Sequence, residues 1–168
     1  PGSGSEDERY FTRQIVESTS RMRELLADVL DYAQLGAAIE APPERVELKA
    51  VLSKVLSNLS ASLQETKALV TSARLPALMG FEGHFVAVLQ NLIGNAIKYR
   101  SDAAPRIHVS FQNKPDGCVF AVSDNGIGIN PEFHTKIFLA FKRLHGSTIP
   151  GTGIGLSICQ RVVERYGG

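Results

Sequence analysis

The chain has 168 residues, of which 43% are hydrophobic and 21% are charged, and its formal net charge is +1. This composition is typical of a globular protein with room for one domain and an appendage. The near-neutral charge gives no reason to expect nucleic acid or an anionic membrane as a partner, and no apolar run approaches the roughly 20 residues that cross a bilayer. The separated Cys118 and Cys159, both in apolar surroundings, predict packed, reduced thiols in a cytoplasmic protein.

The N-terminal segment predicts one long helix. Residues 1–5 are interpreted as a tag or linker remnant. From Glu6 to Leu35 the chain has neither proline nor glycine, and apolar side chains recur with heptad spacing. This face predicts packing on a partner chain or on the domain, and the alternative is a solvated linker helix. Gly36 and the prolines after it end the helix and predict a hinge over 37–44.

The first half of the globular part predicts alternating strands and helices. Arg45 to Leu48 is expected to form a short strand, and Leu48 to Leu63 a helix with one apolar face. Lys67 to Ser72 and Leu75 to Met79 are expected to pair as two strands. Phe81 to Tyr99 is a second strongly apolar helix.

The second half predicts two further strands, Arg106 to Phe111 and Cys118 to Ser123. A short helix is expected near Pro131 to Phe138, then a glycine-rich loop over 143–153 and a last helix over 154–166. Helices interleaved with an antiparallel or mixed sheet predict an α+β two-layer sandwich.

Asp124 lies at the end of an apolar strand and is followed by Gly126 and Gly128. A strand that ends in aspartate holds the carboxylate at the rim of a sheet. The glycines permit positive φ angles and the close approach of a flat ligand. Asp-Asn-Gly is also an ordinary turn sequence, so this stretch alone leaves both interpretations open.

The helix over 81–99 carries Asn91, Asn95 and Lys98 along one stripe. Such polar groups are costly to bury unless something binds them. A Mg²⁺–triphosphate would satisfy them, because amide oxygens can ligate the cation and the ammonium can meet phosphate. The alternatives are that Asn91 is a satisfied core amide and that Tyr99 only packs.

The segment Gly151-Thr152-Gly153-Ile154-Gly155-Leu156 opens the last helix. Glycines before a helix start expose backbone N–H groups, and the helix dipole favours an anion there. The spacing is neither a Rossmann pattern nor a Walker loop. Phe138 and Phe141 are candidates to anchor a mobile loop, and Lys142 and Arg143 are candidates to reach phosphates.

Four stretches together resemble a known family. Residues 91–99, 124–128, 138–141 and 151–156 resemble, in order and spacing, the N, G1, F and G2 boxes of sensor histidine kinases, particularly those attached to phytochromes and PAS-type sensors. The resemblance covers about Glu6 to the end. It implies the Bergerat ATP-binding fold for 45–168, with a mixed, mostly antiparallel sheet. It also implies that 6–36 is the second helix of the dimerisation and histidine-phosphotransfer hairpin.

The resemblance assigns roles to individual residues. Asp124 would accept from the exocyclic amine of adenine, Asn95 would ligate Mg²⁺ with help from Asn91, and Lys98 would contact phosphate. The loop between the F and G2 boxes would be the ATP lid. The implied ATP-binding set is Asn91, Asn95, Lys98, Tyr99, Asp124, Gly126, Ile127, Gly128, Phe138, Phe141, Lys142, Arg143, Gly151, Thr152, Gly153, Gly155 and Leu156.

The implied activity is transfer of the ATP γ-phosphoryl group to a histidine. The gyrase and heat-shock chaperone ATPases have a water-activating glutamate where Asn91 stands, so slow hydrolysis is expected here. His84, His108, His134 and His145 all lie outside the N-terminal helix and are expected to be structural or exposed. The phosphoacceptor is therefore absent from this sequence, and autophosphorylation is not expected.

The chain stops where the family continues into further strands, so we expect a fragment with an open sheet edge. The implied partners are ATP, the histidine-bearing helix of the parent kinase, a response regulator, and a second copy through the N-terminal helix. The first alternative is a non-catalytic nucleotide-sensing or dimerisation module that recruits a partner through this helix. The second is an ATPase that uses water as the acceptor.

Overall fold

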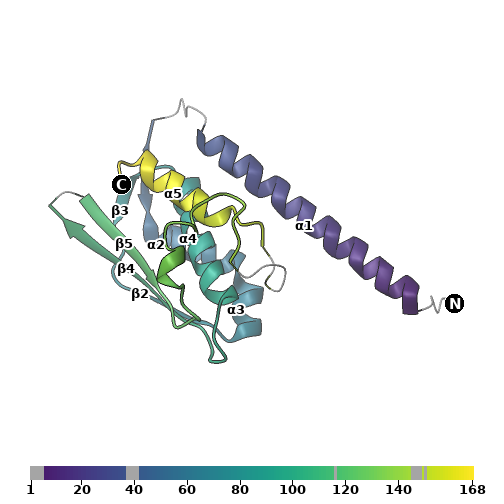
Figure 1. The fold of residues 1–168 in the computed structure, drawn as a ribbon. Helices are drawn as coiled ribbons and strands as arrows, with labels where there is room; N and C mark the ends of the chain where they lie inside the picture. The colour runs from purple at the N-terminus through teal and green to yellow at the C-terminus, as the bar shows by residue number, and fades with distance from the viewer. Residues whose placement is uncertain (1–5, 37–41, 116, 145–148, 150) are drawn as a thin grey trace.

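The computed structural model describes residues 6–36, 42–115, 117–144, 149 and 151–168. Its elements in chain order are α1 Glu6–Gly36, β1 Glu44–Glu47, α2 Leu48–Asn58, α3 Ser60–Thr66, β2 Leu69–Ser72, β3 Ala77–Gly80, α4 Glu82–Lys98, β4 Arg106–Lys114, β5 Gly117–Ser123, the 3-10 turn η1 Pro131–Phe133 and α5 Gly155–Arg165. The helices α2 and α4 lie against the strands, which makes the predicted α+β two-layer arrangement, and α5 packs on α4 and α1 (Figure 1).

The long helix α1 is confirmed, and it touches the domain through only part of its length. Leu25 and Tyr32 pack against buried side chains of the α5 region. The guanidinium carbon of Arg161 lies 4.5 Å from the centre of the Tyr32 ring. The N-terminal half of α1 projects away from the domain (Figure 1). Most of the large side chains of the predicted apolar stripe are exposed in this chain, namely Phe11, Ile15, Met22, Leu26, Val29 and Leu30.

The strands form two small sheets. In the first, β2 pairs with β4 in parallel and β4 pairs with β5 antiparallel; in the second, β1 pairs with β3 antiparallel. The expected pairing of 67–72 with 75–79 is therefore wrong, because the chain leaves one sheet and enters the other between them. The backbone shows this change: the N–H of Ala73 donates to the carbonyl of Val109, whereas the N–H of Leu48 donates to the carbonyl of Pro76.

Two predicted helices differ locally from the structure. The helix expected over 48–63 is divided at Leu59, whose ψ of 7° interrupts the helical path between α2 and α3. The helix expected over 131–138 is only the turn η1, in which the side chain of Asn130 accepts from the backbone N–H of Glu132. This stretch has too few buried apolar side chains to stabilise a longer helix.

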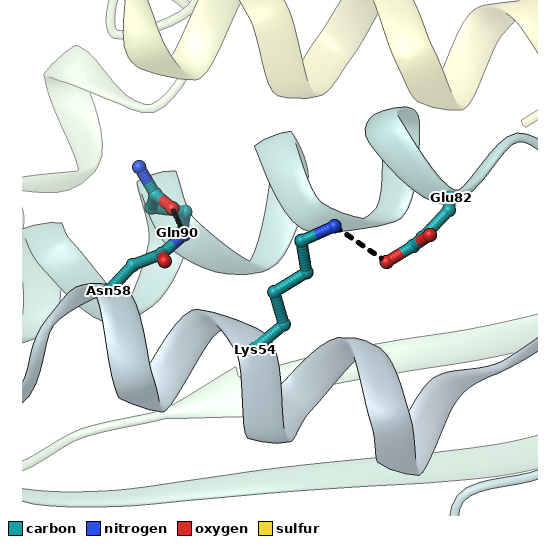
Figure 2. Close-up of polar contacts among 4 residues, drawn as sticks. All are labelled: Lys54, Asn58, Glu82 and Gln90. Atoms are coloured by element: carbon teal, nitrogen blue, oxygen red, sulfur yellow. Dashed lines mark hydrogen bonds and ion pairs between the residues drawn. The ribbon is translucent and has the colours of Figure 1, made fainter.

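The main core lies between the sheets and the pair of helices α2 and α4. Val51 and Val55 of α2, Ile93 of α4, and Ile107 and Val109 of β4 are fully buried in it. The two helices are also joined along an exposed side by two polar contacts, both at 2.9 Å: Lys54 to Glu82 and Asn58 to Gln90 (Figure 2). This packing holds α4, which carries the predicted polar stripe, rigidly on the sheet.

The two cysteines have different environments. Cys159 is buried, and this burial raises the pKa of its thiol to about 12. Cys118 is exposed near the turn between β4 and β5, so the expectation that both thiols are packed is wrong for it.

None of the helices that the structure describes is both long and apolar enough to cross a lipid bilayer. The cytoplasmic location and the domain boundaries at 6–36, 37–44 and 45–168 stay predictions, and most of the predicted hinge lies outside the described residues.

Candidate functional site

A cavity of about 460 Å³ lies between α4, the end of β5 and the loop that leads into α5. These three segments are far apart in the sequence, and each supplies one wall. The lining residues are Asn91, Leu92, Asn95, Ala96, Lys98, Tyr99, Val122, Asp124, Gly128, Ile129, Ile137, Lys142, Arg143, Leu144, Gly151, Thr152, Gly153, Gly155 and Leu156.

On the α4 wall, the side chain of Asn91 is held in one orientation. Its Nδ2 donates to the carbonyl oxygen of Ala87, one helical turn earlier, at 2.9 Å. Its Oδ1 lies against Gly155, where a Cβ atom would collide with that oxygen. The glycine at the start of α5 therefore leaves room for an amide oxygen at the edge of the cavity.

The ammonium of Lys98 is placed by a second close approach. Its Nζ lies 4.7 Å from the centre of the Tyr99 ring. A Cβ atom at Gly151 would collide with the same Nζ. Two glycines of the segment 151–156, Gly151 and Gly155, thus approach two polar side chains of α4.

The end of β5 forms the opposite wall. Asp124 Oδ1 accepts from the backbone N–H of Gly126 at 2.7 Å, which uses one of the two carboxylate oxygens. The N–H of Ile127 donates to the carbonyl of Tyr99 at 3.0 Å, and a Cβ at Gly126 would clash with that carbonyl. Gly128 follows with a φ of 70°, in the left-handed region that favours glycine.

The third wall is the segment between η1 and α5. The N–H of Phe141 donates to the carbonyl of Gly153 at 2.9 Å, which joins the middle of this segment to its end before α5. Lys142 and Arg143 follow it and line the cavity. Phe138 and Phe141 do not line the cavity, and the Phe141 side chain is 64% exposed.

The structure brings most of the predicted site residues around this one cavity. The exceptions are Gly126, Ile127, Phe138 and Phe141, of which Gly126 and Ile127 shape the β5 wall through backbone contacts. Sequence reasoning missed the apolar lining residues Leu92, Ala96, Val122, Ile129, Ile137 and Leu144. Helical and strand spacing could have identified three of them, because Leu92 and Ala96 follow the two asparagines and Val122 lies two residues before Asp124.

The described histidines lie outside the cavity lining, as expected of structural or exposed residues. His84 is buried, and its Nδ1 lies 3.1 Å from the hydroxyl of Tyr166. His108 and His134 are exposed, and His145 lies outside the described residues.

Within the described part of the chain, no three histidine, cysteine, aspartate or glutamate side chains cluster closely enough to hold a metal ion.

Comparison with known proteins agrees with this geometry. Residues 80–168 match the family model for "Histidine kinase-, DNA gyrase B-, and HSP90-like ATPase". The chain is 40% identical over 163 residues to Cyanobacterial phytochrome A of Nostoc sp. (strain PCC 7120), covering 96% of this chain and 21% of that protein. It is 37% identical to Phytochrome-like protein Cph1 of Synechocystis sp. (strain PCC 6803), covering 97% of this chain and 22% of that protein. The chain therefore spans about a fifth of the length of these curated relatives.

Solved structures show the same fold. The crystal structure of full-length ShkA in complex with AMPPNP matches with a TM-score of 0.76 and 29% identity, covering 99% of this chain and 35% of that one. The nucleotide-free catalytic domain of the histidine kinase ThkA matches with a TM-score of 0.61, covering 75% of this chain and 83% of that one. At 19% identity this second likeness shows the fold alone. With the family model matching more than half of its residues, the chain belongs to the histidine kinase-, DNA gyrase B- and HSP90-like ATPase family.

Proposed function

We propose that this chain is the ATP-binding catalytic module of a sensor histidine kinase. It would bind Mg²⁺–ATP in the cavity and present the γ-phosphoryl group to a histidine outside this sequence. The observation that carries the proposal is the meeting of Asp124, the asparagine stripe of α4 and the glycine loop around one cavity. The phytochrome relatives and the AMPPNP complex of ShkA support it.

The base would lie against the β5 wall. The carboxylate of Asp124 accepts hydrogen bonds, so it favours the 6-amino group of adenine and repels the 6-carbonyl of guanine. Its Oδ1 already accepts from Gly126, which fixes the orientation of the carboxylate. The apolar side chains of Val122, Ile129 and Ile137 line the cavity and suit the faces of a purine ring.

The residues of α4 fit a hydrated Mg²⁺ that is bound together with phosphates. Magnesium takes oxygen ligands, keeps several waters, and needs only one or two protein groups when phosphates share it. Asn95 lines the cavity, and the Oδ1 of Asn91 occupies the space that a side chain at residue 155 would take. These amide oxygens would hold the ion. When bound, the ion would neutralise charge on the phosphate oxygens and orient them for in-line transfer.

The phosphates would meet cations and backbone amides. Lys98 lies between the Tyr99 ring and Gly151, and Lys142 and Arg143 line the wall beyond the glycine loop. The start of α5 adds N–H groups and the positive end of a helix dipole. Catalysis in this arrangement would consist of positioning and charge stabilisation. Asn91 is no general base, so hydrolysis by water should be slow.

Calorimetry with Mg²⁺–AMPPNP tests nucleotide binding. We expect the wild type to bind, and Asp124→Asn to weaken binding about 10-fold to 100-fold, because hydrogen bonds to charged groups contribute about 1.5–3 kcal/mol. Asn95→Ala should weaken binding in the presence of Mg²⁺ more than in its absence. Asn113→Ala, in the hairpin far from the cavity, is the matched control. Binding that neither site substitution alters would favour the non-catalytic interaction module.

Phosphoryl transfer is tested with labelled ATP. The chain alone should yield no acid-labile phosphohistidine and little free phosphate. Addition of the histidine-bearing helical hairpin of the parent kinase should yield phosphohistidine on the hairpin. Rapid release of phosphate without any acceptor would contradict this proposal and favour the water-using ATPase. Pairing of two copies through the exposed face of α1, and docking of a response regulator, are proposed from the same family relationship.

A further inference from the structure

The side chain of Asn125 continues the β4–β5 ladder after the main chain has left it. The two strands pair antiparallel as far as His108 opposite Ser123. The same register, two residues further along, would bring Arg106 opposite Asn125. Instead, the Asn125 Oδ1 accepts from the backbone N–H of Arg106 at 2.7 Å, and its Nδ2 donates to the carbonyl of Ala104 at 3.1 Å. The side-chain amide thus pairs with two main-chain groups that would otherwise bond to the main chain of a continued β5 strand.

Two further bonds join the same pair of segments. The hydroxyl of Ser101 donates to the main-chain carbonyl of Asn125 at 3.2 Å. The N–H of Ile127 donates to the carbonyl of Tyr99 at 3.0 Å. All four bonds connect the turn after β5 with residues 99–106, which lead from the end of α4 to the start of β4.

This connection joins the two ends of the cavity. Asp124, immediately before Asn125, stands on the β5 wall, whereas Asn95 and Lys98 stand on the last turns of α4. The residues between α4 and β4 form no regular element that would hold their path. The bonds of Asn125 therefore link the residue next to this carboxylate with the stretch that follows the amide and the ammonium of α4.

We propose that Asn125 is a positioning residue for nucleotide binding, which sets the distance between the base end and the phosphate end of the cavity. The inference rests on the proposed function and adds a residue that touches neither end itself. A ligand that spans both ends needs the correct distance between them, whereas a ligand that occupies one end does not. Substitution of Asn125 should therefore weaken the affinity for a ligand that spans both ends more than the affinity for a ligand that occupies one end.

Two substitutions separate the bonds of this amide. Asn125→Ala removes both side-chain bonds. Asn125→Asp keeps an acceptor for the N–H of Arg106 but turns a carboxylate oxygen toward the carbonyl of Ala104, where a donor is needed. The matched control is Asn113→Ala, at the other end of the same two strands.

The measurement compares three probes by calorimetry or NMR titration: Mg²⁺–AMPPNP, adenosine, and Mg²⁺–tripolyphosphate. Both Asn125 variants should lose roughly 10-fold or more in affinity for Mg²⁺–AMPPNP, with adenosine and tripolyphosphate changed by less than about twofold. A merely structural role would weaken all three probes together, because it would lower the folded fraction. Should Asn125→Ala fail to fold, Ser101→Ala is the second variant. It removes the hydroxyl that donates to the Asn125 carbonyl and accepts from the N–H of Ala103, and it should show a smaller loss with the same pattern.

The outcomes distinguish this inference from the proposed function. If the wild type binds Mg²⁺–AMPPNP and both Asn125 variants bind it with the same affinity, the positioning role is overturned and the proposed function is left intact. Equal loss for all three probes would also overturn it. Absence of binding by the folded wild type would overturn both proposals.

Discussion

The buried His84 and the partly exposed Tyr166 show how one pair of side chains joins two helices. His84, at the start of α4, is 7% exposed, and its Nδ1 lies 3.1 Å from the Tyr166 hydroxyl at the end of α5. That hydroxyl also accepts from the backbone N–H of Phe81 at 3.0 Å. Phe85 stacks on the same tyrosine ring. Burial, followed by the charge of Arg165, lowers the pKa of His84 and so favours the neutral imidazole.

This lowered pKa predicts a loss of stability in mild acid. The unfolded chain binds a proton near the ordinary histidine pKa, whereas the folded chain binds it only at lower pH. The stabilisation is therefore present above about pH 6.5 and decreases as the pH falls below it. His84→Gln keeps a polar group near Tyr166 but does not titrate. We expect the free energy of unfolding to fall less for His84→Gln than for the wild type between about pH 7.5 and about pH 5.5.

Denaturant unfolding at the two pH values is the measurement. His108→Gln is the matched control, because His108 is exposed on β4 and should behave as the wild type does. A pH dependence of His84→Gln equal to that of the wild type would contradict the assignment to His84.

At the scale of the element, α5 is held by one narrow apolar face. Ile158 and Val162 are buried, and together with Ile154 they form a small core that contacts α1 through Leu25 and Tyr32. The neighbouring residue on the helix, Val163, is 49% exposed. The position of α5 also sets the position of the glycine loop, because the loop leads directly into the helix.

Two adjacent valines of α5 offer a matched comparison. Val162 is 3% exposed, so Val162→Ala should lower the free energy of unfolding by about 2 kcal/mol, from two lost methylene equivalents and the cavity left behind. Val163→Ala should change it by less than about 0.5 kcal/mol, because that side chain is half in solvent. Chemical denaturation measures both, and equal effects would show that α5 is not packed as described.

At the scale of the whole molecule, the cavity exists only because three distant segments converge. α4 contributes its polar stripe, β5 its terminal carboxylate, and the loop before α5 its glycines. A ligand that contacts all three should stabilise the folded chain, since separation of any segment would break its contacts. Binding energy is therefore converted into resistance to unfolding.

This linkage predicts that Mg²⁺–AMPPNP at 100 times its Kd should raise the free energy of unfolding by about 2.7 kcal/mol. Thermal unfolding followed by circular dichroism, with and without nucleotide, measures the shift. The guanine analogue at the same concentration should give a smaller shift, because Asp124 disfavours its carbonyl. Equal shifts for the two nucleotides would argue against base recognition by Asp124.

The sequence predicted well whatever depends on local periodicity and side-chain chemistry. The bounds of α1 and α4 agree within about two residues, because an apolar repeat of 3.6 residues is visible in the sequence itself. The amide stripe and the carboxylate after the strand, together with the resemblance to sensor histidine kinases, predict Asn95 and Asp124 as site residues, and the structure places both at one cavity. The apolar lining was missed because its residues look like any other core residues.

By itself, then, the sequence determined the helices α1, α4 and α5, the strand that leads into Asp124 and the residue types of the candidate site. Only the tertiary structure decided that β2 pairs with β4 and β3 with β1, that Cys118 is exposed and Cys159 buried, and that Asn125 closes the ladder. The physical reason is the range of the interactions. Helical periodicity is expressed between residues three or four apart, whereas strand partners, burial and cavities depend on contacts between segments far apart in the chain.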